Sequence, residues 1–136
     1  MKALESLRHK LNINAELSGQ EKNTNKIINK FLEKTNPDVH YRNVGGYGII
    51  AIYKGVEEGK NILLRADIDG LNIPGGSQFS HRCGHDGHAT ILCGLAMRYG
   101  KRRPAKGDVI LLFQPAEETG EGAQAVINDP LFQGLK

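Results

Sequence analysis

The chain has 136 residues, of which 39% are hydrophobic and 24% are charged, and its formal net charge is +3. This length fits one domain that buries roughly two-thirds of its unfolded surface. The densest basic run, residues 101–106, lacks an accompanying aromatic ladder, and no stretch approaches the roughly 18 apolar residues of a membrane helix. We therefore expect neither nucleic acid nor a membrane as a partner.

The N-terminal residues and the cysteines indicate the cellular compartment of the protein. Residues 1–8 have mixed charge and no apolar segment, which is not the pattern of a signal peptide. The only two cysteines are Cys83 among histidines and Cys93 in an apolar helical stretch, so they do not form a disulfide framework. The expected location is the reducing cytoplasm.

Two helices are predicted near the N-terminus. The first covers residues 3–10, with leucines along one stripe. Ser18 followed by Glu21 has the capping-box pattern, so a second helix should begin there and end before the Asn-Pro pair at 36–37. Its expected inward residues are Ile27, Ile28, Phe31 and Leu32.

Three strands and a loop should follow these helices. Residues 39–43 and 47–53 are predicted strands on either side of a Gly-Gly turn. Residues 61–67 have an apolar centre that predicts a strand covered on both faces. The stretch 71–80 is rich in Gly, Pro and Ser, which predicts a loop.

The C-terminal part alternates between helix and strand. A helix is predicted from Asp86 to about Tyr99, then a buried strand over 108–113 that Pro115 ends, then a helix over 122–128. The expected core face of the first of these helices is Ile91, Leu92, Leu95 and Ala96. The strand–helix–strand order implies a parallel crossover, and hence an α/β fold with a mixed or parallel sheet between flanking helices.

A metal-binding pattern occupies residues 81–88, which contain three histidines, a cysteine and an aspartate. Imidazole, thiolate and carboxylate are the protein ligands of zinc and its first-row neighbours. Cys83 and His85 are separated by one glycine, so in an extended loop both side chains would reach one ion. This pair is the strongest candidate for metal ligation.

For the other polar residues of the 81–88 run, the sequence leaves two roles possible. Asp86 is placed either to cap the following helix or to accept the second N–H of a ligating histidine. His81 and His88 are either supporting residues or ordinary polar residues of a loop and a helix.

Two adjacent carboxylates, Glu117 and Glu118, follow the last predicted strand. Because ligands bind at the carboxyl ends of such strands, this pair, Asp67 and the 83–88 run should meet in space. One glutamate would bind metal while the other moves a proton between water and a leaving nitrogen. The alternative is a solvated surface pair.

Three stretches carry a resemblance to a known family. Residues 64–71 (LRADIDGL), 81–88 (HRCGHDGH) and 113–118 (FQPAEE), in this order, resemble the N-terminal part of the aminoacylase-type metallohydrolases. This group includes N-acyl-amino-acid amidohydrolases, hippurate hydrolases and auxin-conjugate hydrolases. The resemblance covers nearly the whole chain and implies part of a zinc-peptidase-like catalytic domain.

The resemblance also implies an activity and roles for single residues. It implies cleavage of the amide bond of small N-acyl amino acids by metal-activated water, with two divalent ions (Zn, Mn, Co or Ni) in a complete site. Cys83, His85 and Glu118 would be metal ligands, and Glu117 the general base. Asp67 would support the site, since Arg65 stands where related enzymes have a ligating histidine. Asp86 and His88 would also be supporting residues.

Complete members of this family are longer than this chain. Residues 1–136 are therefore expected to be the N-terminal portion of the catalytic domain, without the inserted dimerisation domain through which a complete protein could form a homo-oligomer. One alternative is an inactive fragment that binds metal weakly. Another is a redox or sensor module that uses Cys83 as a low-pKa thiolate.

Overall fold

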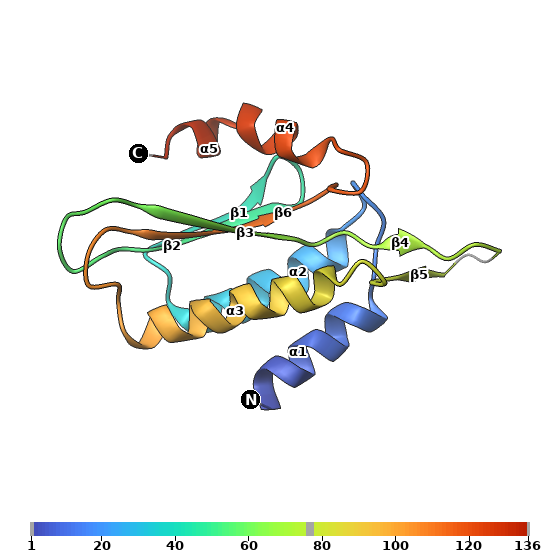
Figure 1. The fold of residues 1–136 in the computed structure, drawn as a ribbon, viewed down its shortest axis with the longest axis horizontal. Coiled ribbons are helices and arrows are strands. Elements are labelled where there is room, and N and C mark those ends of the chain that lie inside the picture. Colours follow the sequence, from blue (N-terminus) through green and yellow to red (C-terminus); the bar gives the residue numbers. More distant parts are fainter. Residues whose placement is uncertain (1, 76–77, 136) are drawn as a thin grey trace.

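The computed structural model describes residues 2–75 and 78–135, which form a mixed sheet with helices on both faces. Figure 1 shows the three layers, with α4 and α5 on one side of the sheet and α1, α2 and α3 on the other. The helices are α1 (Lys2–Ile13), α2 (Lys22–Leu32), the 3-10 turn η1 (Glu33–Thr35), α3 (His85–Lys101), α4 (Gly122–Asn128) and α5 (Pro130–Gln133). The strands are β1 (Val39–Val44), β2 (Gly48–Tyr53), β3 (Ile62–Asp67), β4 (Leu71–Asn72), β5 (Phe79–Ser80) and β6 (Val109–Gln114).

The main sheet has the strand order β1-β2-β6-β3. β1 pairs with β2 and β2 with β6 in antiparallel fashion, whereas β3 and β6 are parallel. Helix α3 connects β3 to β6, so the predicted parallel crossover and the mixed α/β class are confirmed. Because β3 and β6 run in the same direction, the loops that follow them leave from the same edge of the sheet.

The prediction that β3 is covered on both faces is wrong. β3 lies at the edge of the sheet, where Ile62 is 56% and Leu63 is 42% exposed. The strands β2 and β6, which lie inside the sheet, are buried along their whole length. An apolar run alone does not distinguish an edge strand from a central one, because the difference depends on which strand pairs beside it.

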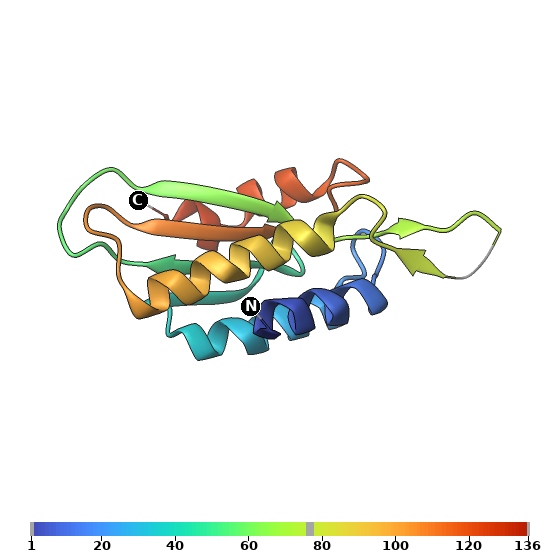
Figure 2. The ribbon, with the colours of Figure 1, turned by 60° about the horizontal axis from the view of Figure 1, so that its bottom comes forward.

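The larger core lies between the sheet and α2 and α3, with α1 packed against both helices from outside (Figure 2). Ile28 and Leu32 of α2 are fully buried, as predicted, whereas Ile27 and Phe31 are partly buried. The prediction that Ile91 belongs to the core face of α3 is wrong, since it is 68% exposed. The buried positions of this helix include Leu92, Cys93 and Ala96.

The opposite face of the sheet is covered by the chain's last two helices. A smaller core of Val44, Ile50, Ile52, Ile110, Leu112 and Val126 lies there, and Phe132 packs against it. Helix α4 has the predicted bounds, whereas α5 was not predicted. Its N-cap is Asp129, whose carboxylate accepts the Leu131 N–H, and Pro130 occupies the first helical position.

The predicted capping box at the start of α2 is wrong. Glu16 provides the cap, because its carboxylate accepts the N–H groups of Asn23 at 3.1 Å and Thr24 at 2.8 Å. Ser18 instead donates its hydroxyl to Asp69 at 2.7 Å, and Glu21 is turned inward. Ser18 and Glu21, which the local pattern assigned to the helix cap, thus hydrogen-bond to groups elsewhere in the fold.

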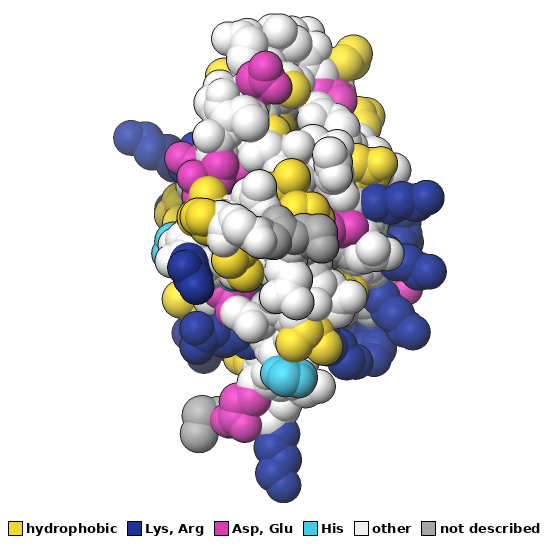
Figure 3. All heavy atoms as spheres, turned by 90° about the vertical axis from the view of Figure 1, so that its right-hand side faces the viewer, with side chains coloured by type: hydrophobic (Ala, Val, Ile, Leu, Met, Phe, Trp, Pro, Cys, Tyr) yellow, Lys and Arg dark blue, Asp and Glu magenta, His cyan; other side chains and the backbone are white. Residues whose placement is uncertain are grey.

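The stretch predicted as a loop contains the short β4–β5 hairpin, which projects from the body of the molecule (Figure 1). Residues 76 and 77 of that predicted loop lie outside the described residues. Seen from this end, Lys and Arg side chains project to both sides of the molecule, and hydrophobic side chains are scattered over the face between them (Figure 3). Among the described residues, every helix is too short or too polar to cross a membrane.

Candidate metal centre

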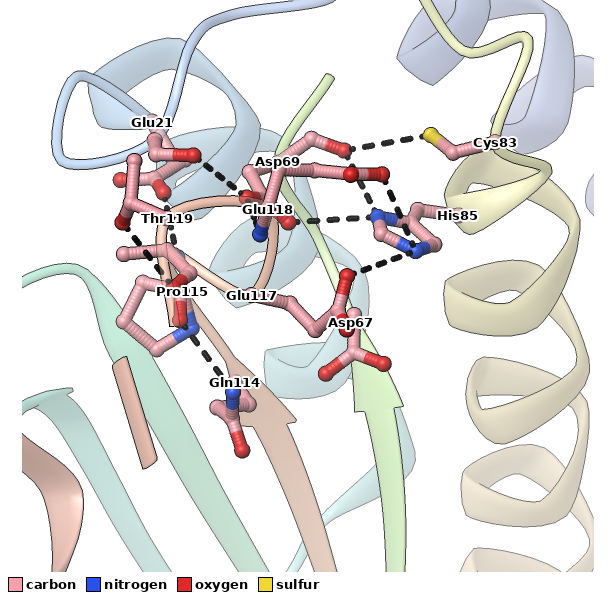
Figure 4. A network of polar contacts seen from close by, with 12 residues as sticks. Glu21, Asp67, Asp69, Cys83, His85, Gln114, Pro115, Glu117, Glu118 and Thr119 are labelled. Carbon is pink, nitrogen blue, oxygen red and sulfur yellow. Dashed lines mark hydrogen bonds and ion pairs between the residues drawn. The ribbon is translucent and has the colours of Figure 1, made fainter. Parts of the chain in front are cut away.

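The candidate site lies where β3 and β6 end. Asp67 and Gln114 are register partners at these ends, so the loops that follow bring distant parts of the chain together. A sulfur of Cys83, a ring nitrogen of His85 and a carboxylate oxygen of Glu118 all lie within 4.8 Å of one another (Figure 4). The structure thus assembles the three residues that the sequence singled out as metal ligands.

The route by which Cys83 and His85 converge differs from the expected extended loop. The Gly84 N–H bonds the carbonyl of His81 at 2.9 Å, which closes a turn, and His85 already belongs to α3. Gly84 has a φ of +88°, a left-handed conformation that residues with a side chain rarely adopt. This glycine therefore lets the thiol and the imidazole approach each other across the start of the helix.

The orientation of His85 is fixed by Asp69. Nδ1 of the buried His85 ring lies 3.0 Å from the Asp69 carbonyl oxygen and 3.2 Å from its Oδ1. Both partners are acceptors, so Nδ1 carries a proton, and in the neutral ring Nε2 keeps its lone pair. Nε2 lies 3.7 Å from Oε2 of Glu117 and 3.9 Å from Oε1 of Glu118.

Asp69 contacts two of the candidate ligands, and sequence reasoning did not single it out as a site residue. It is fully buried, and its Oδ2 also accepts the Ser18 hydroxyl at 2.7 Å and the Glu118 N–H at 2.9 Å. A single carboxylate thus holds one candidate ligand by its ring and another by its backbone. The available signal was its position just after β3, two residues beyond Asp67.

Asp86 does not make the histidine contact that was one of its two expected roles. Its buried carboxylate accepts hydrogen bonds from Asn12 at 3.0 Å and Arg8 at 3.3 Å, which join the start of α3 to α1. Burial opposes ionisation, but these contacts and the Gly87 N–H together lower the pKa of Asp86. The group is a charged link between two helices beside the site.

Asp67 lies beside the carboxylate of Glu117 (Figure 4). Its Oδ2 bonds Arg65 at 3.1 Å, and Arg65 also donates to Oε1 of Gln114 at 3.0 Å. Burial raises the pKa of Asp67, although the Arg65 charge opposes this shift. Arg65 therefore ties together the ends of β3 and β6 below the candidate ligands.

The two outer histidines of the motif have different environments. His81 is buried, and burial lowers its pKa, so its neutral form is favoured. His88 is exposed, with its ring centroid 5.7 Å from that of His85. The structure places His88 at the margin of the site, and neither ring belongs to the three-residue group of ligand atoms.

The thiol of Cys83 does not have the surroundings of a redox thiolate. Its sulfur lies 3.8 Å from the carbonyl oxygen of Asp69, and burial raises its pKa. Reactive cysteines instead occupy electropositive surroundings that lower the pKa. Cys93 is fully buried in the core and is not bonded to Cys83, so the redox interpretation finds no support here.

The carboxylate pair follows an unusual backbone turn. Ala116 has a φ of +50°, and its N–H bonds Oε1 of Glu21 at 2.8 Å. After this turn, both glutamates face His85, with the Glu117 side chain 40% and the Glu118 side chain 28% exposed. The pair therefore faces the imidazole of His85, while both side chains keep contact with solvent.

A mixed α/β sheet with a thiol, an imidazole and carboxylates at its strand ends has the features of a metal-dependent hydrolase domain. The chain belongs to the peptidase family M20/M25/M40, whose sequence model matches residues 63–136. Its curated relatives include the hippurate hydrolase of Campylobacter jejuni, which is 38% identical over 95% of this chain and 36% of that protein. The N-acetylcysteine deacetylase of Bacillus subtilis is likewise 38% identical, over 96% of this chain and 37% of that protein.

Solved structures show the same similarity. The Bacillus subtilis YXEP protein, described as a dinuclear metal-binding peptidase of the M20 family, matches with a TM-score of 0.86 and 37% identity. The match covers 99% of this chain and 40% of that one. A putative aminohydrolase from Staphylococcus aureus matches with a TM-score of 0.84 and 30% identity, covering 97% and 38% of the two chains. The chain thus spans well under half the length of these relatives.

Proposed function

We propose that this chain carries the metal-binding part of an amidohydrolase that cleaves small N-acyl amino acids. The observation that supports this most directly is the convergence of Cys83, His85 and Glu118 within 4.8 Å. The substrate class is supported by relatives named for hippurate and N-acetylcysteine, both of which are acylated amino acids. A metal-dependent hydrolase needs ligands, a base and an open position for substrate. These three residues would supply the ligands, and Glu117 would supply the base.

The donor set fits a divalent transition metal. Thiolate, imidazole and carboxylate all bind zinc, and three protein ligands with one open position are typical of catalytic sites. Ligand atoms around a tetrahedral zinc lie about 3.3 to 3.8 Å apart, given metal–ligand distances of about 2.0 to 2.3 Å. The 3.9 Å between His85 Nε2 and Glu118 Oε1 is close to this range.

Glu117 is the proposed general base. When bound, a divalent ion would polarise the scissile carbonyl and lower the pKa of a nearby water molecule. The Glu117 carboxylate lies 3.7 Å from His85 Nε2 and is partly exposed. From this position it would take a proton from water and return it to the leaving nitrogen.

Metal binding and turnover test this proposal together. Co²⁺ is titrated into the chain while its absorption spectrum is recorded, and glycine release from N-benzoylglycine is measured with Mn²⁺, Co²⁺, Ni²⁺ or Zn²⁺. We expect Co²⁺ to bind with a thiolate charge-transfer band, and turnover to fall about 10²- to 10⁴-fold in Glu117→Gln while Co²⁺ binding persists.

The results separate the proposal from its alternative. A chain that binds no Co²⁺ would contradict the metal centre itself. A chain that binds Co²⁺ but releases no glycine would instead support a metal-binding portion that is inactive by itself. Turnover that is unchanged in Glu117→Gln would remove this residue from the role of base.

A further inference from the structure

Glu21 connects the start of α2 to the loop that carries the carboxylate pair. The residue is fully buried, and its Oε1 accepts the N–H of Gly19 at 2.9 Å and the N–H of Ala116 at 2.8 Å. Residues 21 and 116 are 95 positions apart in the sequence, so this contact is purely tertiary. Figure 4 shows Glu21 on the side of the Glu117–Glu118 turn away from His85.

The residue that Glu21 holds determines where the carboxylate pair points. Ala116 is left-handed, with a φ of +50°, and residues with a Cβ seldom adopt this conformation without support from their surroundings. Its carbonyl oxygen accepts the Gly122 N–H at 3.0 Å, so both backbone polar groups of this residue, and with them the peptide units on either side of it, are fixed. Because Ala116 directly precedes Glu117, its backbone angles set the direction of both glutamates.

Glu21 does not serve the helix that it precedes. The first N–H groups of α2 are capped by Glu16, and no side-chain cap comes from Glu21. Its Oε2 is buried without a hydrogen-bond partner among the described residues, and the carboxylate of Asp69 repels its charge. Burying a carboxyl group in this way costs free energy unless its hydrogen bonds compensate for the loss of water. The long-range hydrogen bond that Glu21 makes is the one to the Ala116 N–H.

We propose that Glu21 is a positioning residue, whose bond to the Ala116 N–H keeps the left-handed turn that aims Glu117 and Glu118 at His85. The effect on metal binding rests on the proposed function, whereas the effect on the turn does not. Asp69 holds the same loop at the Glu118 N–H, so two buried carboxylates hold it at residues 116 and 118. Neither the metal ligands nor the proposed base touches Glu21 directly.

Two substitutions separate the reach of this side chain from its charge. Glu21→Gln keeps the length and a carbonyl acceptor but removes the acid, whereas Glu21→Asp keeps the acid but is shorter by one methylene. Positioning requires reach, so Gln should preserve the contact to Ala116 and Asp should lose it. Glu16→Asp is the matched control, because it shortens a carboxylate beside the same helix without a contact to the loop.

Amide hydrogen exchange in the metal-free chain measures the turn directly. We expect the Ala116 amide to exchange at least about tenfold faster in Glu21→Asp than in the wild type, relative to the Leu111 amide in β6. The rate should stay near the wild-type value in Glu21→Gln and Glu16→Asp. Equal acceleration in Glu21→Asp and Glu16→Asp, or an unchanged rate in Glu21→Asp, would overturn the proposal.

A Co²⁺ titration of the same variants measures the consequence for the site. We expect the affinity to fall about tenfold to a hundredfold in Glu21→Asp, as for other groups that orient ligands, and to stay within about threefold in Glu21→Gln. If the wild-type chain bound no Co²⁺, the proposed function would fail while the exchange rates still decided the role of Glu21. An affinity loss in Glu21→Gln as large as in Glu21→Asp would show that charge, not position, matters.

Discussion

Asp69 lies against His85 in a way that leaves one ring nitrogen free. Its carbonyl oxygen and its Oδ1 are 3.0 and 3.2 Å from Nδ1, so the proton is held there and Nε2 faces the two glutamates. The other carboxylate oxygen accepts the Glu118 N–H at 2.9 Å. The tautomer of one candidate ligand and the backbone of another thus depend on the same buried group.

Replacing Asp69 with alanine should therefore weaken metal binding about tenfold to a hundredfold, as measured by calorimetry with Co²⁺ or Zn²⁺. The loss arises because the Glu118 N–H loses its acceptor, while Nδ1 of His85 keeps only the backbone carbonyl of residue 69, so the ring is held less firmly. Asp108→Ala is the matched control, since its carboxylate also accepts a backbone N–H, that of Gly55, but lies just before β6 begins. A similar loss of affinity in both variants would contradict a specific role of Asp69.

The two cysteines should differ in their effect on the bound metal. Cys83→Ala should remove the thiolate-to-Co²⁺ charge-transfer band and lower the affinity, because the sulfur of Cys83 belongs to the ligand group. Cys93→Ala should retain the band, although it should cost roughly 1 kcal/mol of stability through a small cavity in the core. A band that survives in Cys83→Ala would show that the thiol is not a ligand.

His40 should make the stability of the chain depend on pH. It is half-buried on β1, with Nε2 2.8 Å from Oδ1 of Asn29, and burial together with the Arg42 charge lowers its pKa below 6.5. A lowered pKa favours the neutral form in the folded state, so the stabilising contribution is complete above pH 6.5 and is lost as the pH falls through the folded-state pKa.

Urea unfolding of the wild type and of His40→Gln at several pH values tests this expectation. The wild type should lose stability relative to the variant as the pH falls from about 7.5 to 5, because only the wild-type side chain must become charged. The difference between the two proteins cancels the titration of the other histidines. A difference that is independent of pH would contradict the lowered pKa.

Gly122 should not tolerate a side chain. A Cβ built at this position would lie 1.6 Å from the carbonyl oxygen of Pro115, a backbone atom that cannot move without disturbing the Glu117–Glu118 turn. Gly122→Ala should destabilise the chain by about 1 to 3 kcal/mol or more in urea unfolding. Gly134→Ala, where the nearest atom is 3.4 Å away, should stay within about 1 kcal/mol. Equal stability of the two variants would contradict this crowding.

Local pattern was sufficient for most elements of the fold. The helices α3 and α4 and the strands β1, β2 and β6 were predicted to within two residues of their bounds, because apolar periodicity and Gly or Pro at the ends are local properties. Helix α1 was also predicted, but it extends three residues past its predicted end. The ligand candidates were also recognisable, since a thiol, an imidazole and carboxylates at these spacings suit a metal.

The incorrect predictions concerned which hydrogen-bond partner a side chain binds and which strands lie beside a given strand. Ser18 and Glu21 have the spacing of a helix cap whether they bind the helix or the site, and the edge position of β3 depends on its neighbours. The capping atoms are the same in both arrangements, so only the competing donors and acceptors of the folded chain decide between them.

The sequence by itself determined the chemistry of this protein: its donor atoms, its carboxylate pair and the elements that carry them. The tertiary structure decided which buried groups hold those atoms in place. Asp69 and Glu21 contact residues far away in the chain, through hydrogen bonds to a ring and to the backbone of a turn. Such contacts leave no periodic or compositional pattern, because they form only where the ends of parallel strands bring distant loops together.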